Sequence, residues 1–178
     1  MVCANSQLDN FISLSILEIP PVSVEATKYS CAQLRHNQVV DTFFSVRTQA
    51  VRGLGVVTAF FTNVETGDGQ NQEIDIEFTG ATTSLLWAST WRDGHNFTRA
   101  IPLGFDAALA PHDYSFRWRA EEVTWYIDGI ELLARTRQST LPRQAPTRLY
   151  ISTWLRTPSS WAGQYDPTAP RKQTSSSV

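Results

Sequence analysis

Three acidic residues alternate with three apolar residues in the segment NQEIDIEFTG, which occupies positions 71–80. Successive side chains of a β-strand point to opposite faces, so the segment predicts a strand with Glu73, Asp75 and Glu77 on one face and a core on the other. Asp and Glu are poor strand formers, and neighbouring like charges repel each other. Because this arrangement costs stability, the three acids indicate a functional site.

Two carboxyl groups on one strand face could hydrolyse a glycosidic bond with retention of configuration. Such a reaction needs carboxyls about 5 to 5.5 Å apart, one to attack the anomeric carbon and one to protonate the leaving oxygen. The Cα atoms of Glu73 and Glu77 would be roughly 13 Å apart along a strand, so their side chains must lean together on a concave sheet. Asp75 can hydrogen-bond either one, and the neighbouring charges would keep Glu77 protonated.

The alternative interpretation is a solvated strand face whose acids pair with lysines or arginines on neighbouring strands. Strict alternation of three acids and the 6 tryptophans of the chain favour the site, because clustered like charges are a means of shifting pKa values.

Size and charge limit the function classes. With 178 residues the chain is long enough for one domain and too short for two comfortable ones. The net charge of −2 and the lack of a Lys/Arg cluster argue against nucleic acid or an anionic membrane surface as a partner. The apolar stretch FISLSILEIPPV is interrupted by polar residues and ends in two prolines, so it predicts a strand rather than a membrane span or signal peptide.

Short alternating runs separated by turn residues predict an all-β sandwich. The Asp128-Gly129 pair predicts a two-residue hairpin turn, since both positions need positive φ. Residues 167–178 are polar and aperiodic, and we expect an irregular surface tail there. The expected strands are Leu14–Ile19, Cys31–Leu34, Thr42–Thr48, Gly55–Thr62, Gln72–Phe78, Ser84–Trp91, Phe97–Ile101, His112–Arg119, Glu122–Ile127, Ile130–Arg135 and Arg148–Trp154.

The two cysteines, Cys3 and Cys31, lack the CxxC spacing or histidine partners typical of zinc sites. From the residues alone they are either two buried thiols or one disulfide that closes an N-terminal loop. The sequon Asn96-Phe97-Thr98 permits glycosylation if the protein is secreted, and so favours an extracellular setting.

The segment EIDIEFTG resembles the E-I-D-I-E-F-x-G signature of family 16 glycoside hydrolases, the family of bacterial lichenases and related β-glucanases. This resemblance covers residues 3 to 166 and implies one domain over 1–166. It implies a concanavalin A-like β-jelly roll of two antiparallel sheets, with a sugar cleft on the concave face. Five further segments carry the likeness: YSCAQLR (29–35), GLGVVTAFFT (53–62), IPLGFDAALAPHDYSFRW (101–118), WYIDG (125–129) and WAGQY (161–165).

The resemblance implies a role for each acid. Glu73 would be the nucleophile that forms a glycosyl-enzyme, Asp75 the residue that orients it, and Glu77 the general acid that later acts as base. The same resemblance matches Cys3 and Cys31 to a disulfide. It implies a secreted, monomeric, retaining endo-β-glucanase acting on β-1,3/1,4- or β-1,3-glucan, and we expect neither cofactor nor metal.

Several positions depart from the family pattern. Asn71-Gln72 stands where relatives have Trp-Asp, and Gln33 stands where they have a glutamate. Trp87, Ser89 and Trp91 replace Gln, Asn and Tyr. The strand that precedes Cys3 in relatives and their final strand are not evident here, which suggests missing terminal strands. Two alternatives therefore stay open: a glucan transglycosylase of the cell-wall remodelling type, and a non-catalytic glycan-binding jelly roll.

The resemblance places Trp154 and Trp161 where relatives line the cleft, and Trp91 follows the acidic strand. Flat aromatic side chains suit the apolar faces of sugar rings, so we expect Trp91, Trp154 and Trp161 to form subsites. We expect Ser89, Gln33 and Asn71 to contact substrate as well. Trp118 and Trp125 lie in core-like hairpin patterns and are predicted to be packing residues.

Overall fold

The computed structural model describes residues 4–8, 15–18, 31–39, 43–65, 71–136, 142, 147–155, 161–164 and 173–177. Every regular element in these ranges is a β-strand. None of the described residues belongs to a helix that could cross a membrane. The strands are β1 (Ala4–Leu8), β2 (Ser15–Glu18), β3 (Cys31–Val39), β4 (Phe43–Thr48), β5 (Val56–Glu65), β6 (Asn71–Thr79), β7 (Leu85–Arg92), β8 (His95–Pro102), β9 (His112–Arg119), β10 (Glu122–Ile127), β11 (Ile130–Thr136), β12 (Thr147–Leu155) and β13 (Gln173–Ser177).

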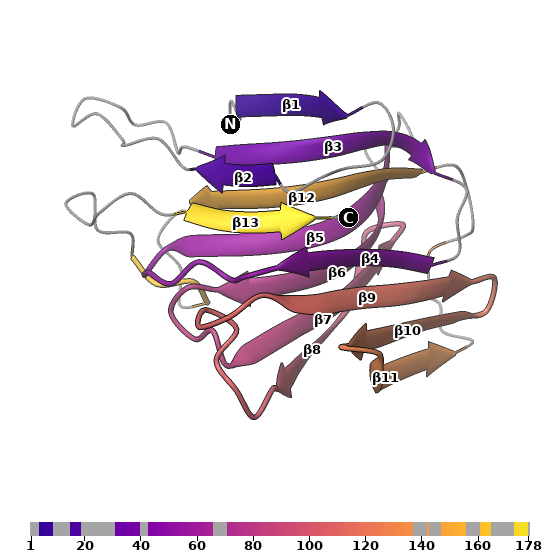
Figure 1. Cartoon of the computed structure of the whole chain (residues 1–178). Helices are drawn as coiled ribbons and strands as arrows, with labels where there is room; N and C mark the ends of the chain where they lie inside the picture. The colour runs from indigo at the N-terminus through magenta and orange to yellow at the C-terminus, as the bar shows by residue number, and fades with distance from the viewer. Residues whose placement is uncertain are drawn as a thin grey trace.

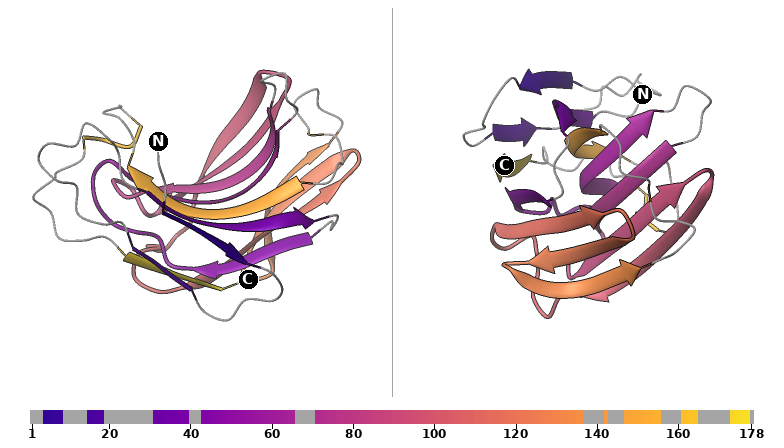
Figure 2. Two further views of the ribbon diagram at one scale, coloured as in Figure 1. Left: turned by 90° about the horizontal axis from the view of Figure 1, so that it is seen from above. Right: turned by 90° about the vertical axis from the view of Figure 1, so that its right-hand side faces the viewer.

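The strands form two sheets that lie face to face (Figure 1). The seven-stranded sheet has the order β1-β3-β12-β5-β6-β7-β8, and the six-stranded sheet has the order β11-β10-β9-β4-β13-β2. All pairs are antiparallel except β1 with β3, which is parallel. Viewed from above, the seven-stranded sheet is strongly bent (Figure 2). The predicted all-β sandwich is confirmed.

The core lies between the two sheets and is built from large aromatic and branched side chains. Alternation on β6 sends Ile74, Ile76 and Phe78 into it, each at most 2% exposed. Trp118 and Trp125 enter from the opposite sheet and are buried, so their predicted packing role is confirmed. The acid-bearing face of β6 is therefore held by one continuous apolar layer beneath it.

Two hairpins have two-residue turns with positive φ. The predicted Asp128-Gly129 turn joins β10 to β11, with φ of 49° and 79°. A second Asp-Gly turn at Asp93 and Gly94, with φ of 51° and 78°, joins β7 to β8. The strands on both sides of this second turn are predicted, whereas the Asp-Gly turn between them is not.

A close backbone approach explains the glycine that ends the acidic segment. A Cβ atom on Gly80 would lie 2.3 Å from the main-chain oxygen of Gly53 and 2.7 Å from that of Val51. Gly53 donates its N–H to the Gly80 oxygen at 2.9 Å, and Gly80 donates to the Val56 oxygen at 2.8 Å. Only a residue without a side chain fits between these chains.

The expectation of an irregular tail is wrong at residues 173–177, which form β13. This strand pairs with β2 and β4 in the six-stranded sheet. Its sequence, QTSSS, lacks the apolar alternation that predicts a strand. The strand forms through backbone hydrogen bonds to its neighbours, which leave no side-chain pattern in the sequence. The expected absence of terminal strands stays a prediction. Strand β1 was not predicted either.

Candidate active site

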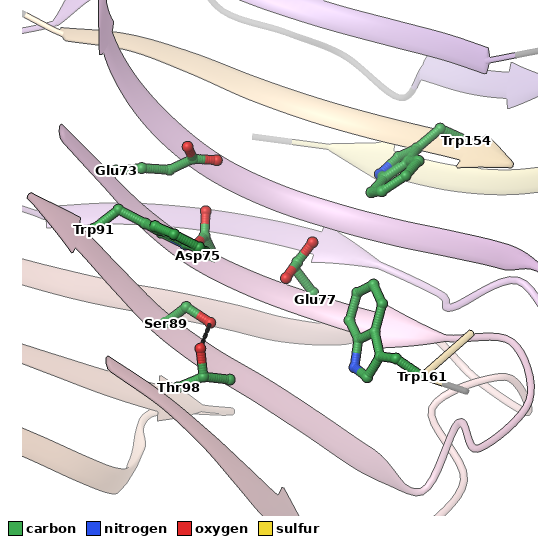
Figure 3. Close-up of a pocket in the computed structure, with 8 residues that line it drawn as sticks. All are labelled: Glu73, Asp75, Glu77, Ser89, Trp91, Thr98, Trp154 and Trp161. Atoms are coloured by element: carbon green, nitrogen blue, oxygen red, sulfur yellow. Dashed lines mark hydrogen bonds between the residues drawn. The ribbon is translucent and has the colours of Figure 1, made fainter. Parts of the chain in front are cut away.

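The three acids lie in one row along β6, on the face opposite the core. Asp75 is 3% exposed, while Glu73 and Glu77 are partly buried. Cross-strand pairing gives each acid a neighbour on β7: Glu73 faces Trp91, Asp75 faces Ser89 and Glu77 faces Trp87. The predicted alternation is confirmed, and it places the carboxyl groups on the face that Figure 3 shows as the floor of a cleft.

The cleft has a volume of about 350 Å³. All three acids point into it, together with aromatic side chains from β7, β12 and the segment 161–164 (Figure 3). Its lining residues are Glu73, Asp75, Glu77, Ser89, Trp91, Thr98, Trp154 and Trp161.

Glu73 and Asp75 hydrogen-bond each other through their carboxyl groups. A bond between two carboxyls requires one proton, so the pair holds a single negative charge. Burial raises the pKa of Asp75 well above its ordinary value, and the charges of Glu73 and Glu77 raise it further. Burial also raises the pKa of Glu73, but the hydrogen bonds from Asp75 and Asn63 oppose this rise. The larger rise for Asp75 favours a proton on Asp75 and an ionised Glu73.

Two indole groups fix Asp75 from opposite directions. The indole N–H of Trp91 donates to its carboxyl group on the cleft side. On the core side, Nε1 of Trp125 donates to its main-chain oxygen at 3.0 Å. The central acid of the row is thus held through both its side chain and its backbone.

Residues 14–171 match the sequence model of the family described as Glycosyl hydrolases family 16. This chain belongs to glycosyl hydrolase family 16. A β-glucanase of Bacillus subtilis (strain 168) is 32% identical over 165 residues, covering 89% of this chain and 66% of that protein. A β-glucanase of Bacillus licheniformis is 30% identical over 168 residues, covering 90% of this chain and 68% of that protein. The chain thus spans about two thirds of the length of these curated relatives.

Solved structures agree with this assignment to family 16. A prokaryotic β-1,3-1,4-glucanase (lichenase) derived from a mouse hindgut metagenome superposes with a TM-score of 0.82 at 25% identity, covering 92% of this chain and 77% of that chain. The β-glucanase of Bacillus licheniformis gives a TM-score of 0.79 at 26% identity, covering 92% of this chain and 75% of that chain. The predicted family and jelly-roll fold are confirmed.

The family 16 cleft gathers most of the residues that the sequence singled out. Ser89 and Trp91 line it from β7, and Trp154 lines it from β12. Trp161 lines it too, and its ring packs edge-on against Trp87 with centroids 5.9 Å apart. Trp87 is thus a support for Trp161 and is not among the lining residues.

Gln33 and Asn71 are described only through their backbones. Gln33 pairs with Ser152, which pairs with Ala59, which in turn pairs with Glu77. This register places Gln33 in the same cross-strand row as Glu77. Asn71 lies at the start of β6, two residues before Glu73. Their predicted contacts with substrate stay predictions.

The cysteine pair cannot be placed, because Cys3 lies outside the described residues and Cys31 is described only through its backbone. Its disulfide stays a prediction. Within the described ranges, no group of three or more His, Cys, Asp and Glu side chains is arranged to hold a metal ion.

Two polar residues of the site were missed by the sequence analysis. Thr98 of β8 lines the cleft, and its hydroxyl lies 3.1 Å from that of Ser89. Asn63 of β5 donates its side-chain N–H to Oε2 of Glu73 at 3.1 Å. In the strand register Asn63 lies opposite Glu73, and Thr98 lies opposite Ser89. The sequence does not show these neighbours until the pairing of the strands is known.

Proposed function

We propose that this protein is a retaining endo-β-glucanase that hydrolyses β-1,3/1,4- or β-1,3-glucan by double displacement. The observation that carries the proposal is the row of Glu73, Asp75 and Glu77 on one face of β6, inside a cleft with tryptophans at both ends. The β-glucanases of two Bacillus species, at 32% and 30% identity, support a glucan as substrate.

Glu73 is the nucleophile in this proposal. As the ionised member of the carboxyl pair it attacks the anomeric carbon, and the glycosidic bond to the leaving sugar breaks. Glu77 gives its proton to the leaving oxygen. Glu77 then removes a proton from water, which attacks the same carbon and releases Glu73 as a carboxylate. Two inversions give a product of retained configuration.

Asp75 tunes this reaction without bonding to the sugar. Its proton is shared with Glu73, so it supports the negative charge that Glu73 carries before attack and regains on release. Trp91 fixes the orientation of the Asp75 carboxyl. Such fixed donors stabilise charge without reorganising during the reaction.

The aromatic side chains suit an endo-acting enzyme. Trp91 stands beside Glu73, whereas Trp154 and Trp161 stand beside Glu77 (Figure 3). A polysaccharide lying along β6 would therefore meet an apolar platform on each side of the scissile bond. Trp91 is 39% exposed, so its ring is available to a sugar.

We further propose that the enzyme is secreted, acts as a monomer and contains a Cys3–Cys31 disulfide, since such bonds persist in oxidising compartments. Mass spectrometry after alkylation of natively produced, folded protein tests this point. Two freely alkylated thiols would remove the disulfide and weaken the argument for secretion.

A product assay on a panel of β-glucans and galactans, with and without oligosaccharide acceptors, tests the proposed activity. We expect shorter β-glucan oligosaccharides whose new reducing ends first appear in the β configuration. Transfer products in place of hydrolysis would establish the transglycosylase alternative. Binding without turnover would establish the glycan-binding alternative.

A further inference from the structure

We propose that Asn63 is a positioning residue for Glu73, whose amide N–H holds the nucleophile ionised and in one orientation. The inference rests on the proposed function, because it takes Glu73 to be the nucleophile. It adds a residue on β5 to a site whose acids all lie on β6.

The strand register places the two side chains next to each other. Asn63 is the direct cross-strand partner of Glu73, so both project from the same face of the seven-stranded sheet. Nδ2 of Asn63 lies 3.1 Å from Oε2 of Glu73, and the bond is partly buried. A donor fixed on a neighbouring strand moves less than one on a loop, which suits it to hold a carboxylate.

Asn63 and Asp75 both support the charged form of Glu73. Burial alone raises the pKa of Glu73, while the hydrogen bonds from Asp75 and Asn63 lower it. Asp75 reaches Glu73 along β6, and Asn63 reaches it across from β5. Two donors from different directions leave the carboxylate one favoured orientation.

The amide oxygen of Asn63 is left without a hydrogen bond when the amide N–H binds Glu73. Oδ1 of Asn63 is buried and has no hydrogen-bond partner among the described residues. An unpaired buried acceptor is unfavourable. Turning the amide around would set its oxygen against Oε2, which is repulsive while Glu73 is ionised. The amide orientation is therefore the one that serves a negatively charged Glu73.

The charged groups on the strands around Glu73 are the same in all the variants used below. Asp75 and Glu77 share its strand. Arg148 of β12 pairs with Asn63 and so lies in the same cross-strand row. Arg92 follows Trp91 on β7 and forms an ion pair with Asp93 at 3.4 Å. A difference between variant and wild type thus reports on Asn63 itself.

The variants Asn63→Ala and Asn63→Asp test whether Asn63 positions Glu73 or only supports the fold. The alanine variant removes the donor, whereas the aspartate variant keeps the shape, cannot donate when ionised and adds a negative charge. We expect the acidic limb of kcat/KM against pH to move upward in Asn63→Ala and further in Asn63→Asp. On the acid side of the optimum kcat/KM should fall roughly tenfold or more, through kcat, with KM changed less than about twofold.

Asn96→Ala is the matched control. Asn96 of β8 occupies the same cross-strand row, beyond Trp91, and is exposed. Its side chain donates only weakly to Thr98, at 3.4 Å. We expect the pH profile of this variant to match that of the wild type.

A titration of the free protein keeps the test independent of turnover. Carbon-13 carboxyl NMR, with the Glu73 signal assigned from Glu73→Gln, measures the ionisation of Glu73 directly in each variant. An upward shift in the order wild type, Asn63→Ala, Asn63→Asp supports the inference. An unchanged Glu73 titration in two folded variants would overturn it. A wild-type protein that cleaves no glucan would instead overturn the proposed function, while the titration still decides the role of Asn63.

Discussion

The Trp125 side chain spans the core between the two sheets. Its Nε1 donates a hydrogen bond of 3.0 Å to the main-chain oxygen of Asp75 on the seven-stranded sheet. Trp125 is fully buried, so the bond is made away from water. The bond connects the packing of the sandwich to the middle of the acid row. It therefore makes a core residue part of the system that sets the position of Asp75.

Trp125→Phe should lower both stability and activity. The variant removes a buried hydrogen-bond donor and some volume, which we expect to cost about 2 to 4 kcal/mol of unfolding free energy. Because the Asp75 backbone is then held less tightly, kcat should also fall. Denaturant unfolding and kcat/KM are the measurements.

Trp118→Phe provides the comparison for this variant. Trp118 is a buried core tryptophan whose Nε1 donates to the main-chain oxygen of Pro142 at 3.2 Å, away from the cleft. The Trp118→Phe variant should lose about as much stability as Trp125→Phe while keeping its kcat. Equal losses of kcat in both variants would show that Trp125 acts only through general stability.

Asp75→Asn should raise stability while lowering activity. The folded-state pKa of Asp75 lies well above its ordinary value, chiefly because of burial. Its contribution to stability is therefore complete below the unfolded-state pKa and is lost as the pH rises through the folded-state pKa. The Asp75→Asn variant does not ionise at this position and so does not lose stability as the pH rises. The difference in melting temperature between variant and wild type should therefore grow from acidic to neutral pH. We expect kcat/KM to drop at least tenfold, because the shared proton is gone. An advantage that is constant with pH would contradict a protonated Asp75.

Gly80→Ala should destabilise the fold strongly. The added Cβ would meet main-chain atoms of Gly53 and Val51, so the backbone itself must move, at a cost of roughly 2 to 4 kcal/mol. Gly104→Ala is the control: its φ is +76° but nothing lies within 4 Å of the added atom, so only backbone strain of about 1 kcal/mol is expected. Similar melting temperatures for the two variants would mean that the close approach at Gly80 is unimportant.

Glu77→Gln should lower kcat/KM for natural glucans more than for activated aryl glycosides. The amide cannot protonate the leaving oxygen, so natural glucans with poor leaving groups should lose far more kcat/KM than activated aryl glycosides, which need little protonation. The alkaline limb of the pH profile should also disappear. Equal losses for both substrate types, with the alkaline limb kept, would exclude Glu77 as the acid.

The sequence predicts the parts of this fold that carry a side-chain pattern. Alternation in 71–80 defined β6 and the direction of its acids, and the Asp128-Gly129 pair defined the β10–β11 hairpin. Strand β13 was missed because a run of Ser and Thr has no apolar period, and its stability comes from pairing with β2 and β4. Pairing of strands distant in sequence has no local signal.

The same limit applies to the site. Glu73, Asp75 and Glu77 could be found because all three lie on one strand. Asn63 and Thr98 could not, because they reach the site only through register with Glu73 and Ser89. The raised pKa of Asp75 likewise depends on burial, which no local pattern predicts.

Glu73→Ala with added azide tests whether Glu73 is the nucleophile. The variant removes the attacking carboxylate from the cleft without emptying the core, so it should stay folded, bind oligosaccharide and lose turnover. Azide should then occupy the vacated space, restore part of the activity on an activated glycoside and give a glycosyl azide of inverted configuration. Near-normal activity of Glu73→Ala without azide would exclude Glu73 as the nucleophile.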